Sequence, residues 1–512
     1  MNIRGGEKSL LLLLHPKGDV LREVYENIRA GRNLRANLIE LKKMLKEDGG
    51  QREFREICGD NYDRIMKCLA DGDPKVRKNA AAILGILRVP ESADVLMDAY
   101  ESEDTLFVRP EYLSALSELD CGAYLPVFHR RLEQLRVYDA PENEKKHVRE
   151  EIAALQELIL KKEGLQKHSF SGYYGTNAVI LTTFPAFRDA LAAELPFPKK
   201  LLKGGVSATV GDMNLVLTNR LWQEMLFVLQ CEKGMPARPE VIARALRESD
   251  LSVILAENHR SDAPFYFRVG VAGAMPREEQ SGFAKKTAAA IETAFSGSLV
   301  NSVSHYEAEI RLAVSREGGV TPYLKLYTLP DHRFRYRKYH VAAGMRPVLA
   351  AGIMALAKPY LAEYAQVLDP FCGVGTLLLE RRFAGPVRSA YGIDIFGEAI
   401  QKARANTKLT GMPVNYINRD FFDFTHEYLF DEIITDMPAD SGSREETDTL
   451  YRRFFEKSAQ LLAEHGRIFC YSGEMGLVKK YLRLTGQFRL LKEYSILEKS
   501  GTYLFILEKR QA

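Results

Sequence analysis

One stretch, residues 366–376 with the sequence Gln-Val-Leu-Asp-Pro-Phe-Cys-Gly-Val-Gly-Thr, constrains the fold of this chain more than any other. The apolar residues before Asp369 are typical of the end of a buried strand, which the following proline breaks. Gly373 and Gly375 then form a tight turn, and an apolar run opens a helix. Glycines let the backbone approach a ligand where a Cβ atom would collide, and a helix N-terminus offers unpaired N–H donors. The stretch therefore predicts the floor of a nucleotide-cofactor site in an α/β domain.

The residues around the turn narrow the type of cofactor. A dinucleotide-binding fingerprint needs a third glycine three residues after Gly375, where this chain has Leu378. No phosphate-loop lysine follows the turn, and the carboxylate of Asp369 before it favours a cationic amino-acid moiety. Here the sequence resembles the S-adenosylmethionine-dependent methyltransferases, whose first motif in the RNA-modifying branch is similar to Asp-Pro-Phe-Cys-Gly-x-Gly-Thr. The resemblance implies that S-adenosylmethionine is the cofactor and that it is bound by Asp369, Phe371, Gly373, Gly375 and Thr376.

Length and composition limit the class of protein. A chain of 512 residues is too long for one hydrophobic core, so we expect roughly three domains. The net charge of +3 means that any contact with nucleic acid must come from local basic patches. The six cysteines have no paired spacing, so we expect reduced thiols in a cytoplasmic protein, with neither a disulfide framework nor a metal site. No apolar segment has the length of a membrane span, and no membrane partner is expected.

Residues 1–165 show helical periodicity and internal similarity. A Val-Arg or Leu-Arg pair recurs at positions 34–35, 76–77, 108–109 and 148–149. The pattern resembles HEAT-type repeats, in which stacked helix pairs bury a shared apolar seam, although a small bundle of amphipathic helices is the alternative. Such repeats mostly bind macromolecules, so a protein partner is expected here. Whether Arg77, Arg109 and Arg149 face RNA or bond within the repeat stays open, and bonding within the repeat is favoured.

Residues 166–330 predict a compact α+β unit. We expect strands at 177–183, 265–271, 307–314 and 323–329, with a helix at 283–295 between the second and third. The order resembles the THUMP module that precedes the methyltransferase domain in a group of RNA methyltransferases. The alternative is a structural spacer, because few basic residues stand where an RNA-binding face is expected.

The segment after Pro330 is the most basic part of the chain. Arg333, Arg335 and Arg337 alternate with aromatic residues, so an extended segment would place the three arginines on one face. No acidic residue occurs between positions 332 and 362. Arginine interleaved with aromatic residues suits phosphate contacts and base stacking. We therefore expect an RNA-binding surface formed by Arg333, Arg335, Arg337, Lys338 and Arg346.

Two further predicted strands of the C-terminal part also end in acidic residues. The strand at 390–394 ends in Asp394, whose carboxylate can accept hydrogen bonds from both ribose hydroxyl groups of a cofactor. The strand at 415–417 leads to Asp420 and Phe421. The resemblance implies that Asp420 accepts a hydrogen bond from the adenine amino group. Phe421 is expected to pack on the adenine, with a core position as the alternative.

The fourth strand, at 430–435, leads into Asp436-Met437-Pro438-Ala439-Asp440. Methyltransferases that modify an exocyclic amine have a similar corner of Asn or Asp, any residue, Pro and an aromatic. Since the sulfonium methyl group is already activated, the enzyme mainly has to align the nitrogen lone pair, and Asp436 can do so by accepting an N–H. Pro438 holds the loop, whereas Ala439 replaces the aromatic that stacks on an extruded base.

The resemblance covers residues 331–512, where strands at 467–471, 488–497 and 503–507 complete the order. Together, the three resemblances predict HEAT-like repeats at 1–165, a THUMP-like module at 166–330 and a Rossmann-like class I methyltransferase domain at 331–512. The implied function is S-adenosylmethionine-dependent RNA methylation, with guanine N2 of tRNA or rRNA favoured. A catalytically drifted RNA-binding scaffold and a methyltransferase for another substrate remain alternatives. Cys372 lies in the cofactor turn, so it is expected to pack and not to serve as a cytosine-5 methyltransferase nucleophile.

Overall fold

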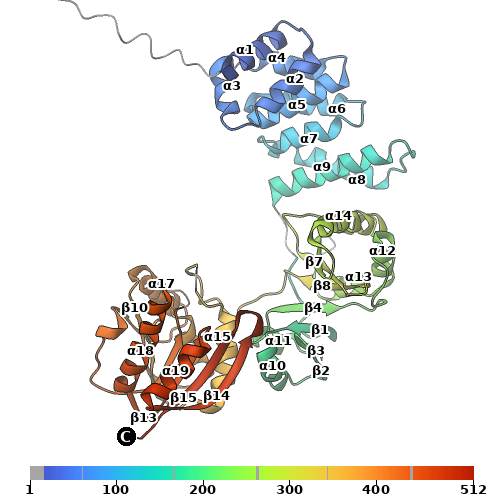
Figure 1. The fold of residues 1–512 in the computed structure, drawn as a ribbon. Coiled ribbons are helices and arrows are strands. Elements are labelled where there is room, and N and C mark those ends of the chain that lie inside the picture. The colour runs from blue at the N-terminus through green and yellow to red at the C-terminus, as the bar shows by residue number, and fades with distance from the viewer. Residues whose placement is uncertain are drawn as a thin grey trace, which may run out of the picture. The chain divides into compact units, whose positions relative to one another are not determined.

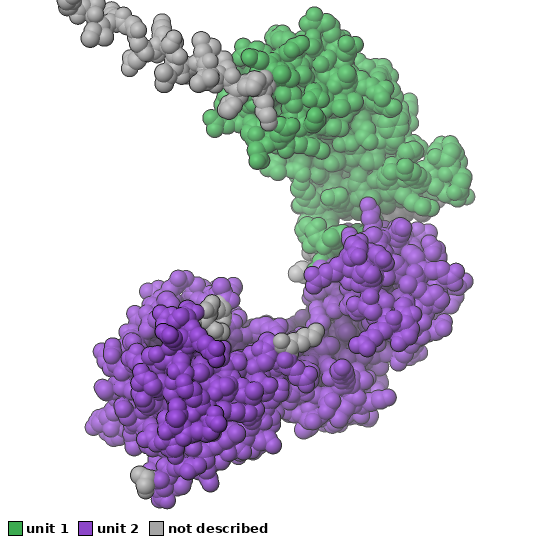
Figure 2. Space-filling view, in the orientation of Figure 1, with its two compact units in different colours: residues 1–167, 296–306 green, residues 168–295, 307–512 purple. Residues whose placement is uncertain are grey.

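The computed structural model describes residues 16–59, 61–164, 168–260, 264–342, 344–438 and 442–511. The chain forms two compact units, residues 1–167 with 296–306 and residues 168–295 with 307–512, which Figure 2 distinguishes by colour. Each unit is described by itself. In the described parts of the chain, no helix combines the length and the apolar composition that a membrane span requires.

The N-terminal segment of the first unit, described from residue 16 to residue 164, is built from helices (Figure 1). Its α-helices are α1 (Pro16–Arg29), α2 (Leu34–Met44), α3 (Gly50–Cys58), α4 (Asp63–Lys67), α5 (Pro74–Leu87), α6 (Ala93–Ser102), α7 (Arg109–Ser117), α8 (Leu125–Val137) and α9 (Lys145–Glu163). Short 3₁₀ turns connect some of them, namely η1 (Cys68–Ala70), η2 (Pro90–Ser92) and η3 (Gly122–Tyr124). The prediction of a helical N-terminal region is confirmed.

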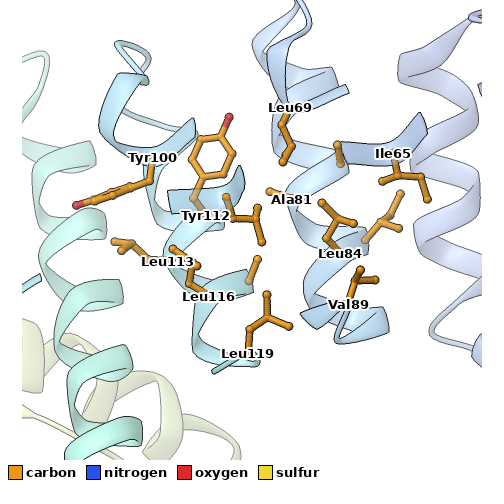
Figure 3. Packing of buried hydrophobic residues seen from close by; sticks show 14 of the residues in the cluster. Ile65, Leu69, Ala81, Leu84, Val89, Tyr100, Tyr112, Leu113, Leu116 and Leu119 are labelled. Atoms are coloured by element: carbon orange, nitrogen blue, oxygen red, sulfur yellow. The ribbon is translucent and has the colours of Figure 1, made fainter. Parts of the chain in front are cut away.

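The repeated basic pairs of the sequence mark a continuous stack of helices. They lie at the start of α2, α5, α7 and α9, and each of these helices packs on the next. Their buried faces form one apolar core, part of which Figure 3 shows around Leu84 and Leu113. A Cβ atom on Gly85 would lie 2.8 Å from the Cα atom of Ala115, so glycine allows α5 and α7 to approach closely. The stack has the organisation of a helical repeat, and its HEAT-type classification stays a prediction.

Two of the repeat arginines bond within the helical unit. Arg77 donates from Nη2 to Oε1 of Glu103 over 2.7 Å, and Arg109 donates from Nε to the Glu103 carbonyl over 2.7 Å. Arg109 also pairs with the buried carboxylate of Glu151 at 3.4 Å. Arg149 is exposed. An RNA-facing ladder is therefore not supported for Arg77 and Arg109, whose guanidinium groups join neighbouring helices.

An eight-stranded sheet of order β2-β3-β1-β4-β8-β7-β5-β6 comes next, and all of its strands except β6 belong to the second unit. Its strands are β1 (Asn177–Thr182), β2 (Lys199–Leu202), β3 (Gly205–Val210), β4 (Glu224–Val228), β5 (Phe265–Gly273), β6 (Leu299–Asn301), β7 (Ala308–Val314) and β8 (Val320–Leu326). The helices are η4 (Pro185–Phe187), α10 (Arg188–Glu194), α11 (Met213–Thr218), α12 (Pro239–Glu248), α13 (Leu251–Glu257) and α14 (Arg277–Ala294). The predicted combination of strands and helices is present, and α14 begins earlier than the helix predicted at 283–295. Identity with a THUMP module stays a prediction.

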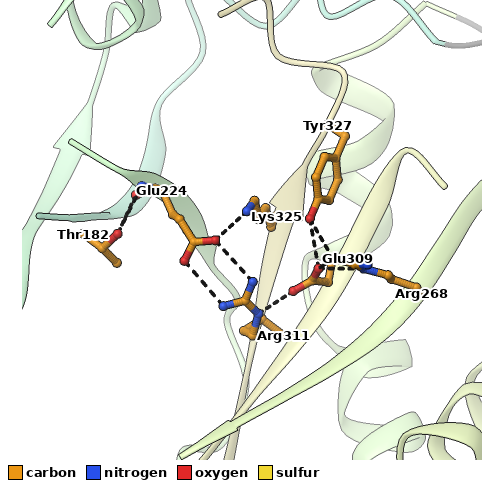
Figure 4. A network of polar contacts seen from close by, with 7 residues as sticks. All are labelled: Thr182, Glu224, Arg268, Glu309, Arg311, Lys325 and Tyr327. Atoms are coloured by element: carbon orange, nitrogen blue, oxygen red, sulfur yellow. Dashed lines mark hydrogen bonds and ion pairs between the residues drawn. The ribbon is translucent and has the colours of Figure 1, made fainter. Parts of the chain in front are cut away.

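Charged side chains on this sheet are paired with one another (Figure 4). The buried carboxylate of Glu309 accepts hydrogen bonds from Arg268 Nε at 2.8 Å and from the Tyr327 hydroxyl at 3.0 Å. Glu224 pairs with Lys325 at 2.5 Å and with Arg311 at 3.4 Å. Because these cations have partners within the sheet, the network stabilises the contact between β4, β5, β7 and β8.

The C-terminal part of the second unit is a seven-stranded sheet of order β11-β10-β9-β12-β13-β15-β14. Its strands are β9 (Ala365–Asp369), β10 (Val387–Asp394), β11 (Asn415–Asn418), β12 (Phe430–Asp436), β13 (Leu462–Ser472), β14 (Phe488–Leu497) and β15 (Thr502–Lys509). The strands β9 to β13 run parallel, whereas β15 is antiparallel to both of its neighbours, β13 and β14. The α/β sheet that the sequence predicts for the C-terminal part of the chain is confirmed, including its antiparallel strand.

Helices cover both faces of this sheet, and the two apolar clusters beneath them form its core. The helices are α15 (Pro347–Ala357), η5 (Lys358–Tyr360), α16 (Thr376–Ala384), α17 (Gly397–Lys408), η6 (Phe421–Asp423), α18 (Arg444–Leu461), α19 (Met475–Thr485) and η7 (Glu498–Ser500). Three carboxylates end adjacent parallel strands: Asp369 ends β9, Asp394 ends β10 and Asp436 ends β12. They therefore lie at the same edge of the sheet, where open α/β folds bind ligands.

Candidate active site

A cavity of about 680 Å³ opens at the carboxyl ends of β9, β10 and β12. Many of the residues predicted to bind cofactor or substrate line it, namely Asp369, Phe371, Gly373, Thr376, Asp394, Asp436 and Pro438. The cavity is therefore built from the turn that the sequence singled out and from three strand ends. Gly375, Asp420 and Phe421 are not among the residues that line it.

The glycine turn has the left-handed backbone that only glycine adopts readily. Gly373 has a φ of 52° and Gly375 a φ of 79°. A Cβ atom on Gly375 would lie 2.1 Å from the hydroxyl oxygen of Tyr416, which itself is 2.9 Å from the Thr407 hydroxyl. Gly375 thus shapes the turn and makes room for a buried tyrosine beneath it.

Asp394 holds the turn against the end of β10. Its Oδ2 accepts a hydrogen bond from the Gly373 N–H at 2.9 Å, and its Oδ1 accepts one from the Phe396 N–H at 2.8 Å. Each carboxylate oxygen has a second lone pair, so the group can still accept hydrogen bonds from a diol in the cavity. The prediction for Asp394 is compatible with this geometry.

Phe396 is a residue that sequence reasoning missed. Its side chain lines the cavity and is 68% exposed, which is unusual for a phenylalanine. An exposed ring beside a cavity offers a stacking surface for a flat ligand such as a purine. Its place two residues after the strand-end Asp394 was the available signal.

Asp369 is a buried carboxylate among other carboxylates. It is 2% exposed and accepts a hydrogen bond from the Phe371 N–H at 3.2 Å. Burial raises the pKa of Asp369 well above its ordinary value, and the charges of Asp436 and Asp394 raise it further. Because an ionised carboxylate is costly to bury without a cation, this cluster fits a positively charged ligand. S-adenosylmethionine carries a sulfonium and an ammonium group, so the residues present suit it.

Asp436 and Pro438 lie on the opposite side of the glycine turn from Asp394, at the end of β12. Burial raises the pKa of Asp436 to about 7. The chain after it is held by a hydrogen bond of 3.0 Å from the Met437 N–H to the Tyr471 carbonyl. Ala439 and Asp440, on which the alternative of a drifted catalytic site depends, lie outside the described residues.

Asp420 and Phe421 occupy other positions than expected. Asp420 caps η6 by accepting a hydrogen bond of 2.9 Å from the Phe422 N–H. Phe421 is 1% exposed and packs between Phe371 and Phe454, with ring centroids 5.7 and 6.3 Å away. A cofactor contact by Phe421 is therefore not supported, because Phe371 covers it and is the ring that reaches the cavity. A hydrogen bond from Asp420 to adenine stays a prediction.

The extended basic face is corrected by the structure. Residues 333–336 form a turn, and Arg333 is buried. Its guanidinium pairs with Asp331 at 2.7 Å and lies 3.3 Å from the ring centroid of Trp222. We therefore remove Arg333 from the expected RNA surface, since these partners take up its charge inside the protein.

The same segment joins the eight-stranded sheet to the C-terminal domain. Arg220, which precedes β4, pairs with the buried Glu380 of α16 at 2.6 Å, and the Tyr336 hydroxyl donates to the same carboxylate. Phe187 inserts into the core of the C-terminal domain, where a Cβ atom on Gly352 would lie 2.1 Å from its ring. The aromatic residues that alternate with arginine thus serve packing at this junction.

The other predicted RNA-binding residues differ from one another. Arg335, Lys338 and Arg346 are exposed. Arg335 bonds to His332 at 3.0 Å, and Arg346 lies 5.2 Å from the ring of Phe184. Arg337 is half-buried and bonds to two residues that line the cavity, as described below. RNA contacts of the three exposed residues stay predictions.

Asn406 in α17 is a second residue that was missed as part of the site. It is fully buried, accepts a hydrogen bond from the Tyr339 N–H at 2.9 Å and donates to the Tyr339 carbonyl at 2.8 Å. It also donates to the carbonyl of Val374 in the glycine turn at 3.4 Å. A polar residue on the apolar face of a helix was the signal, and here it fixes the basic segment to the turn.

Comparison with known families identifies the domain that holds this cavity. Residues 335–497 match the family model described as RMKL-like, methyltransferase domain. The C-terminal domain is a methyltransferase domain. Its cofactor is S-adenosylmethionine, which agrees with the cationic ligand that the carboxylate cluster favours.

One curated relative is the tRNA (guanine(10)-N2)-dimethyltransferase of Methanothermobacter thermautotrophicus. It is 32% identical over 136 residues, which cover 26% of this chain and 39% of that protein. The match thus spans about two-fifths of the relative's length.

Two solved structures share their fold with about two thirds of this chain. TrmN from Thermus thermophilus has 21% identity and a TM-score of 0.50, covering 65% of this chain and 99% of that one. SMU.472, solved as a complex with SAH, has 16% identity and a TM-score of 0.51, covering 66% of this chain and 99% of that one. At these identities the likeness concerns the fold alone.

Proposed function

We propose that this protein is an S-adenosylmethionine-dependent RNA methyltransferase that acts on an exocyclic amine, with guanine N2 of tRNA or rRNA favoured. The observation that carries the proposal is the Asp436-Met437-Pro438 corner at the cavity, with its carboxylate beside the donor site. The name of the M. thermautotrophicus relative, a tRNA guanine-N2 dimethyltransferase, supports the same target.

Methyl transfer requires the protein to align the target nitrogen with the methyl group and to accept one proton from that nitrogen. The bound donor supplies a methyl group on a sulfonium. Asp436 accepts an N–H of the target amine and thereby directs the nitrogen lone pair toward that methyl group. Once nitrogen has been methylated it must lose a proton, and a carboxylate with a pKa of about 7 is suited to accept it at neutral pH. Pro438 restricts the backbone that carries this carboxylate.

The donor site is proposed to use the remaining strand ends. Asp394 accepts hydrogen bonds from the ribose hydroxyl groups, and Asp369 provides negative charge for the cationic part of the donor. Phe396 offers its exposed ring to the adenine, and Asp420 accepts a hydrogen bond from the adenine amino group. The glycines allow the backbone to approach the ligand.

RNA is proposed to contact the exposed cations of the basic segment, which are Arg335, Lys338 and Arg346. A THUMP-like role for residues 166–330 supports an RNA substrate, and a HEAT-like role for residues 1–165 suits a protein partner. The methyltransferase domain itself is proposed to begin at residue 331.

The test is a transfer assay with the Asp436→Ala variant. The full chain is incubated with tritiated donor and bulk tRNA or rRNA from cells that lack the protein, and the product nucleoside is identified by mass spectrometry. We expect N2-methylguanosine with the wild-type protein, and transfer reduced about 100-fold or more in the variant. The variant should still bind S-adenosylhomocysteine, which separates lost chemistry from lost folding. Unchanged turnover would remove the amine-orienting role of Asp436.

A further inference from the structure

Arg337 bonds to residues of the cofactor cavity wall, although its sequence position suggested RNA. Its Nε donates to the Thr376 hydroxyl oxygen at 3.2 Å, and its Nη2 donates to the Gly344 carbonyl at 3.2 Å. Thr376 and Gly344 both line the cavity. The guanidinium therefore lies directly behind the wall of the donor site and connects two of its parts.

The charge of Arg337 has no acidic partner in the described parts of the chain. Two other arginines at this junction differ in this respect, since Arg333 pairs with Asp331 and Arg220 pairs with Glu380. Burial lowers the pKa of Arg337 below its ordinary value, which reflects the cost of a guanidinium away from water. An anion in the adjoining cavity would offset that cost.

The contact with Arg337 also fixes what the Thr376 hydroxyl can do. Thr376 is 4% exposed and is the first residue of α16, at the end of the glycine turn. Since its oxygen already accepts the Arg337 N–H, its own hydrogen is free to be donated to an acceptor in the cavity. A hydroxyl that accepts from a cation is also a stronger donor.

The methyl donor brings one anionic group into a cavity that is otherwise lined by anions. Its amino-acid end has a carboxylate as well as an ammonium group, and Asp369, Asp394 and Asp436 repel that carboxylate. Next to Thr376, the positive charge of Arg337 lies behind the cavity wall.

We propose that Arg337 is a positioning residue for the carboxylate of the methyl donor, acting through the Thr376 hydroxyl. The inference rests on the donor site and not on the RNA substrate. Arg337, which the sequence placed in the expected RNA-binding surface, would then serve cofactor binding instead.

The experiment compares two ligands that share the adenosine and the sulfur atom. S-adenosylhomocysteine has the amino-acid carboxylate, whereas 5′-methylthioadenosine lacks the amino-acid group. Calorimetry on the full-length Arg337→Met variant should show about ten- to a hundredfold weaker binding of S-adenosylhomocysteine. Binding of 5′-methylthioadenosine should change less than about threefold, and Arg337→Lys should recover part of the loss. A variant that merely distorts the cavity would weaken both ligands alike.

Two further variants keep the inference falsifiable. Thr376→Val should give the same selective loss, and the double variant should be no worse than the more severe single variant, because both remove one pathway. Arg388→Met is the matched control, since Arg388 is exposed and lies at the start of β10, at the opposite end of the strand from the cavity, and the ligand affinities of this variant should stay at the wild-type level. Equal losses for both ligands, or additive losses in the double variant, would overturn the positioning role alone. Failure of the wild-type protein to bind S-adenosylhomocysteine would overturn the donor site itself.

Discussion

Lowering the pH through 7 will weaken the binding of S-adenosylmethionine more than that of S-adenosylhomocysteine. Burial raises the pKa of Asp436 to about 7, so its carboxylate is ionised above that pH and protonated below it. The two ligands share their ammonium and carboxylate groups and differ by the methyl group and the positive charge of the sulfonium. A cation beside Asp436 favours the ionised form, so the donor should bind best above pH 7.

The size of the effect follows from the raised pKa of Asp436. A carboxyl group of this type ordinarily titrates near 3.8, and the difference from about 7 corresponds to about 4 kcal/mol. This is the upper limit of what the sulfonium can recover by restoring the ionised state. Below pH 7, the ratio of donor affinity to product affinity should fall by up to about tenfold per pH unit. Between pH 7.5 and 5.5 we expect a fall of about ten- to thirtyfold.

Isothermal titration calorimetry at pH 5.5, 6.5 and 7.5 measures both affinities in the same buffers. Asp436→Asn is the matched control, because the amide keeps the shape of the side chain and cannot ionise, so its affinity ratio should not vary with pH. A pH-independent ratio in the wild-type protein would refute the reasoning. So would an Asp436→Asn variant with the wild-type slope, since the titrating group would then lie elsewhere, for example at Asp369.

Three further substitutions test the glycine turn, the buried ion pair behind it and the proposed RNA surface. Gly375→Ala should lower the free energy of unfolding by at least about 2 kcal/mol, because it strains a positive φ and meets Tyr416, and urea denaturation followed by circular dichroism measures this. Arg220→Met should cost about 3 kcal/mol in the same assay, since it leaves Glu380 buried without its cation; a loss below about 1 kcal/mol would contradict the pairing. Arg335→Glu should weaken RNA association and flatten its salt dependence in filter binding, and an unaltered slope would move the RNA surface elsewhere.

The strand ends of the catalytic domain could be predicted because they depend on local sequence. When a buried strand belongs to a parallel sheet, an acidic residue at its end lies at the carboxyl edge of that sheet. Asp369, Asp394 and Asp436 obey this rule, and the structure brings all three to one cavity. Phe421 follows its strand end in the same way, but its burial is decided by the ring of Phe371, which comes from a different loop.

The fate of the basic segment could not be predicted because its partners are far away in the sequence. Arg333 is buried against Trp222, which lies 111 residues earlier in the sequence. Arg220 and Tyr336 both bond to the carboxylate of Glu380, which belongs to α16, the helix after the glycine turn. An arginine-rich run thus indicates charge, whereas only the tertiary contacts decide whether that charge meets RNA, a neighbouring domain or a cofactor.

The carboxylate cluster also bears on the release of the product. Transfer of the methyl group converts a sulfonium into a neutral thioether, so the cavity loses one positive charge while Asp369, Asp394 and Asp436 stay in place. The same burial that favours the cationic donor therefore weakens the hold on the product, most strongly where Asp436 is ionised. On this reasoning, the cluster both selects the charged donor and assists product release. The affinity ratio between donor and product, measured above and below pH 7, reports that selection directly.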